Sequence, residues 1–297
     1  MAAGPNLFLI GAMKAGTSAL HRALAQHPDL YMSEPKEPRF FTRPELWPGG
    51  AAAYEALFRA GRDCRFRGES STEYAKAPLF AGTAERIAGY APDARILYLV
   101  RDPIARAVSH YWFNWQVHGE RRDPRVAFRE DPHYLLFGDY AMQLARYRRC
   151  FPAQQIRVVV LEEIERDPRR ELAGVWSWLG LDPAAAVRAE FEARNATPAA
   201  LPSRRPAWLA ALRATPLWRG LRPALPRALR RALRERVEAP VARAASVRDA
   251  AREALGPACR ERVRALAEQL SRGFPLWEGG AEPHSEAGAV ARIEVVA

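Results

Sequence analysis

Short apolar runs alternate with longer segments of mixed polarity along the first two thirds of the chain. Residues 6–10, 94–103 and 155–164 contain uninterrupted apolar runs, which are typical of strands buried on both faces of a parallel sheet. A further short strand is expected within 27–32, and FRGESSTEY (66–74) has the pattern of a strand end that continues into a polar loop. The chain is therefore predicted to form a sheet of several buried strands.

Helical periodicity fills the intervals between these strands. Pro103 occupies a position favoured at the start of a helix, and Gly180 a position favoured just after its end. The segments expected to be helical are 17–26, 51–60, 80–90, the segment that opens at Pro103, 138–151, 167–181 and 258–270. This alternation predicts an α/β fold, a mostly parallel sheet flanked by helices, with ligands at the carboxyl ends of the strands.

The first expected strand leads into a loop with the composition of a phosphate-binding loop, GAMKAGTS (11–18). Loop amides at a helix N-terminus bind anions, Lys14 adds a full positive charge, and the hydroxyls of Thr17 and Ser18 can donate to phosphate oxygens. The loop departs from GxxxxGK[ST], because Lys14 stands two residues before Gly16. Its ligand is therefore either a nucleoside triphosphate or another phosphorylated donor.

A second anion site is expected after the apolar run ILYLV. Arg101 follows this run directly, where a parallel sheet presents side chains to ligands, and Ser109 lies about two turns into the next helix. An arginine can hold a phosphate through two hydrogen bonds, and a serine hydroxyl can add a third. Two anion sites at neighbouring strand ends predict a donor that carries two phosphate groups.

Composition limits the class of protein. The chain has 297 residues, of which 48% are hydrophobic, so a large folded core is expected. No apolar stretch reaches the length of a membrane span, and the first fifteen residues already belong to the expected strand and loop, so no signal peptide is predicted. The three cysteines are odd in number and far apart, which favours reduced thiols and a cytoplasmic location.

The net charge of +11 is concentrated in the C-terminal third. The segment 204–236 alone holds ten arginines and one glutamate. We expect a single domain of 1–297, divided into an α/β core (1–194), a basic, Arg- and Pro-rich helical region (195–245), C-terminal helices (246–277) and a flexible tail (278–297). Such a concentration of positive charge favours an anionic partner, either an acidic acceptor or a membrane surface that 204–236 would contact peripherally.

The two anion motifs together resemble a known family. GAMKAGTSAL resembles the 5′-phosphosulfate loop of the sulfotransferases that use 3′-phosphoadenosine 5′-phosphosulfate (PAPS), and LVRDPIARAVSHYW resembles their 3′-phosphate motif. KEPRFF and GESSTEY resemble the acceptor-side loops of the heparan sulfate branch and its bacterial relatives. The resemblance covers about 7–181 and implies a P-loop-type fold, PAPS as sulfuryl donor and PAP as product.

The resemblance also assigns roles to residues. It implies that Lys14 stabilises the leaving group and that Glu37 is the general base. The residues implied to bind the donor are Lys14, Ala15, Gly16, Thr17 and Ser18 at the 5′-phosphate, and Arg101 and Ser109 at the 3′-phosphate. Those implied on the acceptor side are Lys36, Glu69 and Ser70. Relatives often carry a lysine where this chain has Ser70, a departure that weakens the expectation of a highly acidic sugar.

Three functions are compatible with these patterns. The first is sulfuryl transfer from PAPS to a hydroxyl or amine of a carbohydrate or small metabolite, without a metal. The second is a P-loop kinase in which Asp102 lies on the magnesium side, although the order GK[ST] is missing. The third is a non-catalytic protein that binds polyanions or a membrane through 204–236. No nucleic-acid partner is expected.

Overall fold

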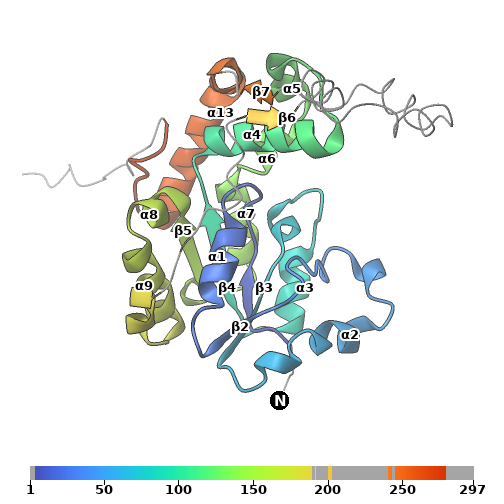
Figure 1. The fold of residues 1–297 in the computed structure, drawn as a ribbon, viewed down its shortest axis with the longest axis vertical. Coiled ribbons are helices and arrows are strands. Elements are labelled where there is room, and N and C mark those ends of the chain that lie inside the picture. The colour runs from blue at the N-terminus through green and yellow to red at the C-terminus, as the bar shows by residue number, and fades with distance from the viewer. Residues whose placement is uncertain (1–3, 189–190, 192–199, 203–239, 243–244, 279–297) are drawn as a thin grey trace, which may run out of the picture.

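Five parallel strands form the centre of the molecule (Figure 1). The computed structural model describes residues 4–188, 191, 200–202, 240–242 and 245–278. The strands of the main sheet are β1 (Leu7–Leu9), β2 (Leu30–Met32), β3 (Phe66–Ser70), β4 (Arg95–Val100) and β5 (Ile156–Val160). The predicted α/β class with a parallel sheet is confirmed.

The strand order places the two anion motifs side by side. The order is β2-β3-β1-β4-β5, and β1 pairs in parallel with both β3 and β4. Leu9 lies opposite Leu97 in this register, and the loop after β1 continues the ladder, since the Ala12 amide donates to the Leu99 carbonyl at 2.6 Å. The loop that carries Lys14 and the strand end that carries Arg101 therefore meet at one edge of the sheet.

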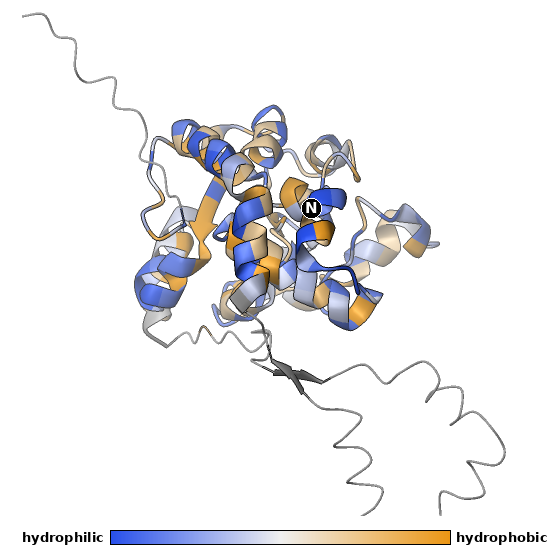
Figure 2. Cartoon of the chain, turned by 90° about the horizontal axis from the view of Figure 1, so that it is seen from above, coloured by the Kyte–Doolittle hydropathy of each residue, from blue (hydrophilic) through white to orange (hydrophobic). Residues whose placement is uncertain are grey.

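Helices connect and cover these strands. Most carry both hydrophilic and hydrophobic residues, as helices that cover a core on one face do (Figure 2). Their bounds are α1 Thr17–Leu24, α2 Gly50–Ala56, α3 Thr83–Tyr90, α4 Pro103–Phe113, α5 Pro124–Glu130, α6 His133–Leu136, α7 Tyr140–Arg148, α8 Leu161–Arg166, α9 Pro168–Leu179 and α13 Ala245–Leu270. In the part of the chain that is described, none of them is long and apolar enough to cross a membrane.

Two predicted elements have different bounds. The strand expected over 155–164 ends at Val160, and α8 begins at Leu161. Glu162 and Glu163 lie in the first turn of that helix, where the helix dipole favours negative charge. The helix expected at 258–270 begins at Ala245 and contains Pro257. Burial of its first half against other helices outweighs the low helix propensity of that proline.

The C-terminal helix α13 joins both parts of the core. Its first half packs with α4 and α5 in a small cluster that includes Tyr111, Trp112 and Leu255, and its second half adds Val263 and Leu266 to the main core (Figure 1). Within 195–245, β6 (Ala200–Pro202) and β7 (Pro240–Ala242) form an antiparallel pair rather than helix. The expected helices of 203–239, the basic segment 204–236 and the tail beyond 278 lie outside the described residues.

Candidate functional site

The loop between β1 and α1 has the backbone of an anion cradle. Lys14 and Gly16 both adopt positive φ, 68° and 93°, so the chain turns sharply before α1 begins at Thr17. A Cβ on Gly16 would lie 2.9 Å from Leu161 Cδ1, so a side chain there would be both strained and crowded. No acidic residue lies in the first turn of α1. The N-terminus of this eight-residue helix therefore presents its positive end to the loop.

The two predicted cationic residues lie together at this edge. The Arg101 guanidinium donates to the Lys14 carbonyl oxygen at 3.1 Å, and Tyr140 donates from its hydroxyl to the Arg101 carbonyl at 2.7 Å. The Lys14 ammonium lies 4.8 Å from the centre of the Phe113 ring, at the end of α4. Ser109, on the same helix, is buried. Lys14 and Arg101 are thus in contact although they are far apart in sequence, and Ser109 lies on the helix whose Phe113 contacts Lys14.

Asp102 stabilises the backbone at this edge of the sheet through hydrogen bonds. Its carboxylate accepts from the Ala105 amide at 2.6 Å, which caps α4, and from the Glu278 amide at 2.8 Å. Burial raises the pKa of this carboxyl, opposed by those two hydrogen bonds. Both oxygens are therefore engaged with backbone amides, an arrangement that does not favour the magnesium-side role expected for a kinase.

Glu37 lies at the centre of a charged cluster. Its carboxylate accepts from the Lys36 ammonium at 3.0 Å, from the Thr72 hydroxyl at 3.1 Å and from the Arg39 guanidinium at 3.0 Å. Burial opposes ionisation of Glu37, but Lys36 and Arg39 outweigh it and hold the pKa of this carboxyl below its usual value. Lys36 is thus a direct partner of Glu37, and Glu37 is ionised at neutral pH.

A second carboxylate, Glu73, lies next to this cluster and was not predicted. Arg39 bridges the two acids, since it contacts Glu37 at 3.0 Å and Glu73 at 3.7 Å. Glu73 also accepts from the Thr42 hydroxyl at 3.0 Å and from Arg43 at 3.3 Å. The Glu73 side chain is 9% exposed, whereas both arginines are 42% exposed, so the carboxylate is buried and its partners reach the surface.

Glu69 and Ser70 support the site from inside the protein. Both are fully buried at the end of β3. Glu69 accepts hydrogen bonds from the hydroxyls of Tyr54, Tyr74 and Ser71, and Ser70 Oγ lies 2.9 Å from His21 Nδ1. Neither side chain reaches a surface where an acceptor could touch it, so the acceptor contact implied for them by the family resemblance does not fit this geometry. The Ser71 hydroxyl instead connects Glu69 to the Arg39 amide, at 3.0 Å.

The burial of Glu69 predicts that the free energy of unfolding depends on pH. Burial raises its pKa from 4.5 to about 7, although three hydroxyls oppose the shift. Between pH 4.5 and about 7, the folded state therefore binds more protons than the unfolded chain. The free energy of unfolding falls as the pH rises through this range, and it does not change further above pH 7 because of this group. We expect Glu69→Gln to remove this decline, which corresponds to roughly 3 kcal/mol. Urea unfolding measured from pH 4.5 to 8 tests this.

The control is Glu85→Gln, which removes an exposed carboxylate on α3 and should leave the slope of the stability profile unchanged. Parallel profiles for wild type and Glu69→Gln would show that folding does not raise the pKa of Glu69.

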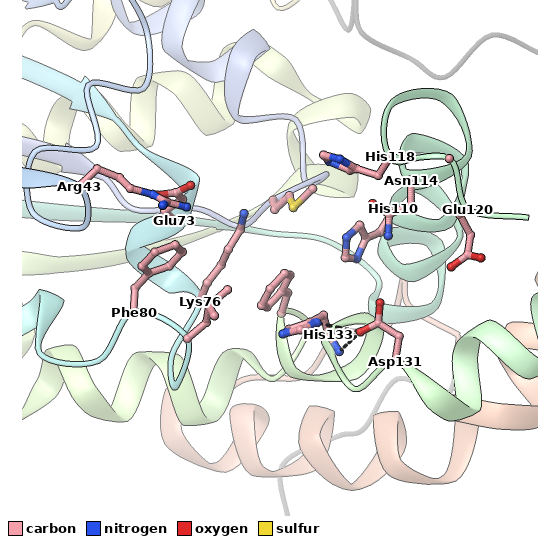
Figure 3. A pocket seen from close by; sticks show the side chains of 14 residues that line it. Arg43, Glu73, Lys76, Phe80, His110, Asn114, His118, Glu120, Asp131 and His133 are labelled. Carbon is pink, nitrogen blue, oxygen red and sulfur yellow. Dashed lines mark hydrogen bonds and ion pairs between the residues drawn. The ribbon is translucent and has the colours of Figure 1, made fainter. Parts of the chain in front are cut away.

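A pocket of about 560 Å³ opens beside the phosphate loop (Figure 3). Met13 of that loop forms part of its wall, α4 contributes His110, and the helical turn after α4 (Asn114–His118) contributes Asn114. The remaining wall residues are Arg43, Glu73, Lys76, Leu79, Phe80, His118, Gly119, Glu120, Asp131, His133 and Phe137. Its volume lies in the range of small-molecule sites.

Glu73, Lys76 and His110 were not predicted as site residues. All three lie within or next to the motifs quoted above, since GESSTEYAKAP continues the acceptor-side loop and His110 follows Ser109. Glu73 and Lys76 lie three and six residues after the GES triplet, and this short distance was the available signal. Only the short helical turn at Thr72–Ala75 decides that Glu73 and Lys76 both face the pocket.

Comparison with known proteins identifies the family. The Sulfotransferase domain model matches residues 4–195, which is well over half of the chain. The chain therefore belongs to the sulfotransferase family. The matched segment includes the phosphate loop, Glu37, Arg101 and Ser109.

Individual relatives agree with this assignment. The chain is 32% identical over 192 residues to human heparan sulfate glucosamine 3-O-sulfotransferase 3B1, a match that covers 60% of this chain but only 46% of the human protein. It is 26% identical over 202 residues to mouse bifunctional heparan sulfate N-deacetylase/N-sulfotransferase 1, of which it covers 22%. A sulfotransferase structure from Alicyclobacillus acidocaldarius superimposes with a TM-score of 0.55 at 31% identity, covering 64% of this chain and 85% of that one.

Proposed function

We propose that the chain transfers the sulfuryl group of PAPS to a hydroxyl or amine of a carbohydrate or small metabolite. The observation that carries the proposal is the meeting of Lys14 and Arg101 at one edge of the sheet, where Arg101 donates to the Lys14 carbonyl. This juxtaposition provides two cationic positions in a chain that belongs to the sulfotransferase family. A donor with two separate phosphate groups fits such a pair.

The residues fit the two phosphates of this donor. The loop at Ala15 and Gly16 and the start of α1 at Thr17 and Ser18 would hold the 5′-phosphosulfate, because they lie at the N-terminus of a helix, where backbone amides bind anions. Arg101 and Ser109 would hold the 3′-phosphate through a guanidinium and a hydroxyl. PAPS supplies an activated sulfuryl group whose departure leaves PAP.

The proposed transfer is an in-line displacement at sulfur. The acceptor oxygen or nitrogen forms a bond to sulfur while the bond between sulfur and the 5′-phosphate oxygen breaks. Glu37 takes the proton of the acceptor, and Lys14 stabilises the negative charge that develops on the departing phosphate. The ionised state of Glu37 follows from its contacts to Lys36 and Arg39.

The relatives and the pocket support a carbohydrate or small-molecule acceptor. The name of the human relative states a heparan sulfate glucosamine acceptor, which supports a carbohydrate for this chain as well. The pocket between the phosphate loop and Glu73 has the size for a small acceptor or part of a larger one. A cytoplasmic location belongs to this proposal and is supported by three cysteines that form no disulfide.

Nucleotide affinity tests the proposal. Adenosine 3′,5′-bisphosphate is expected to bind more tightly than AMP, because AMP lacks the 3′-phosphate that Arg101 would hold. Arg101→Ala should weaken binding of the bisphosphate by about 1.5–3 kcal/mol, the cost of one hydrogen-bonding charged group, and change AMP binding little. Isothermal titration calorimetry measures both affinities.

Arg125→Ala is the matched control, since Arg125 is an exposed arginine on α5 that pairs with Glu253 outside the site. Equal affinity of wild type for the bisphosphate and for AMP would overturn the proposal. Tight, magnesium-dependent ATP binding would favour the kinase instead.

A further inference from the structure

The pocket described above adjoins the proposed donor site. Met13 in its wall precedes Lys14 directly, and His110 in its wall follows Ser109. The aromatic rings of Phe80 and Phe137 form part of its surface (Figure 3). A molecule in this pocket would therefore lie next to the sulfuryl group of a donor bound as proposed.

The acidic side chains of the pocket wall already have cationic or hydrogen-bonding partners. Glu73 pairs with Arg43 at 3.3 Å, Glu120 pairs with Arg122, and Asp131 contacts His133 Nδ1 at 2.8 Å. Glu73 and Glu120 thus have arginine partners within the protein, and Asp131 has a hydrogen-bonding partner. Arg43 is neutralised in the same way, since Glu73 and Glu45 both lie within 4 Å of it.

Lys76 is the exception on this wall. None of the described residues forms an ion pair with its ammonium, which extends into the pocket in Figure 3. The nitrogen lies 5.1 Å from the centre of the Phe137 ring, a contact that stabilises a cation without neutralising it. Burial lowers the pKa of Lys76, and Glu73 and Glu37 oppose this from beyond ion-pair distance. A ligand anion would compensate the charge.

His110 provides a second polar group without a protein partner. Its ring is buried, packs on Phe137 and Tyr134, and lines the same pocket. Its Nδ1 atom makes no hydrogen bond to any described residue. This nitrogen is buried within the wall, so of the two residues Lys76 supplies the polar group that a ligand in the pocket can reach.

We infer that Lys76 binds an anionic group, a carboxylate or a sulfate, on the acceptor. The inference rests on the proposed function, because it concerns the acceptor of that reaction. Ser70 is fully buried and does not line this pocket, whereas Lys76, six residues further along the chain, lies in the pocket wall. An acidic acceptor is thus compatible with this chain.

Binding to PAP-saturated protein tests this without turnover. The probes are p-nitrophenyl β-D-glucuronide, its neutral partner p-nitrophenyl β-D-glucoside, and p-nitrophenyl N-acetyl-β-D-glucosaminide with and without a 6-sulfate. For at least one pair, wild type should bind the charged probe about 10–100-fold more tightly than the neutral one. The pair that shows the difference distinguishes a carboxylate from a sulfate. Lys76→Met should abolish that preference, and Lys76→Arg should keep most of it.

Two controls separate the inference from the proposed function. Lys76→Met should bind PAP as wild type does, which also shows that this variant folds. Arg125→Gln removes one exposed positive charge outside the pocket and should keep the preference for the charged probe. PAP binding with no preference for either charged probe, or a preference that survives Lys76→Met, would overturn the role of Lys76 and leave the donor site intact. Failure of wild type to bind PAP would instead overturn the proposed function.

Discussion

Lys14→Ala is expected to lower kcat about 10²–10³-fold, the largest loss among the predicted effects on the donor side. Lys14 lies in the phosphate loop with positive φ, so its carbonyl meets Arg101 while its ammonium reaches the Phe113 ring at 4.8 Å. A cation held in this way compensates charge that develops on the leaving phosphate in the transition state, as an oxyanion-hole donor does. The measurement is sulfate transfer from labelled PAPS to the best acceptor of a screen.

Unequal losses of PAP affinity and of kcat distinguish stabilisation of the leaving group from simple nucleotide binding. PAP affinity should fall by less than kcat, because the ammonium interacts most strongly with charge that exists only in the transition state. Phe113→Leu is the matched variant, since it removes the ring under the ammonium but keeps the charge. Phe113→Leu should lower kcat by about tenfold or less. A kcat of Lys14→Ala within threefold of wild type would contradict a role at the leaving group.

Glu37→Gln is expected to lower kcat at least about tenfold, with nearly unchanged affinity for PAP. Glutamine keeps the shape of the side chain but cannot take the proton of the acceptor, and general-base help is typically worth about 10²–10⁴ in rate. Lys36 and Arg39 keep the wild-type carboxylate ionised at acidic pH. The wild-type rate should therefore show no loss from protonation of Glu37 between pH 5 and 8, which a pH–rate profile measures.

Glu73 supplies the decisive comparison for this prediction. It is a second acidic partner of Arg39 and lies in the wall of the pocket, so it is the nearest rival for the role of base. Glu73→Gln removes the same charge from the same cluster. If Glu73→Gln stops turnover and Glu37→Gln retains full rate, the base is Glu73 and the family-based assignment of Glu37 is wrong.

Elements with strong local signals were predicted well. The apolar runs at 6–10 and 94–103 form β1 and β4, and Pro103 and Gly180 mark the start of α4 and the end of α9. These signals depend on residues within one or two turns of each other. The 155–164 segment shows the limit of the same reasoning, since the apolar run continues from β5 into the buried face of α8 and periodicity alone does not separate them.

The surroundings of Glu69 could not be predicted in this way. Its neighbours Tyr54 and Tyr74 lie on different segments, and their hydroxyls meet the carboxylate only after α2 packs against the end of β3. The sequence shows a glutamate in a polar loop, a setting in which contact with an acceptor is a reasonable expectation. Packing decides instead that it is fully buried.

The fold class, the family and the two anion motifs follow from the amino-acid sequence alone, because hydrophobic period, loop glycines and the placement of Lys14 and Arg101 are properties of short segments. Which polar side chains share a pocket depends instead on tertiary packing. The parallel pairing of β1 with β3 and β4 brings Lys14 to Arg101, and the turn after β3 places Glu73 and Lys76 in the pocket wall that Met13 of the phosphate loop also lines. Pairing and packing join segments that are far apart in the chain, so no short segment carries this information.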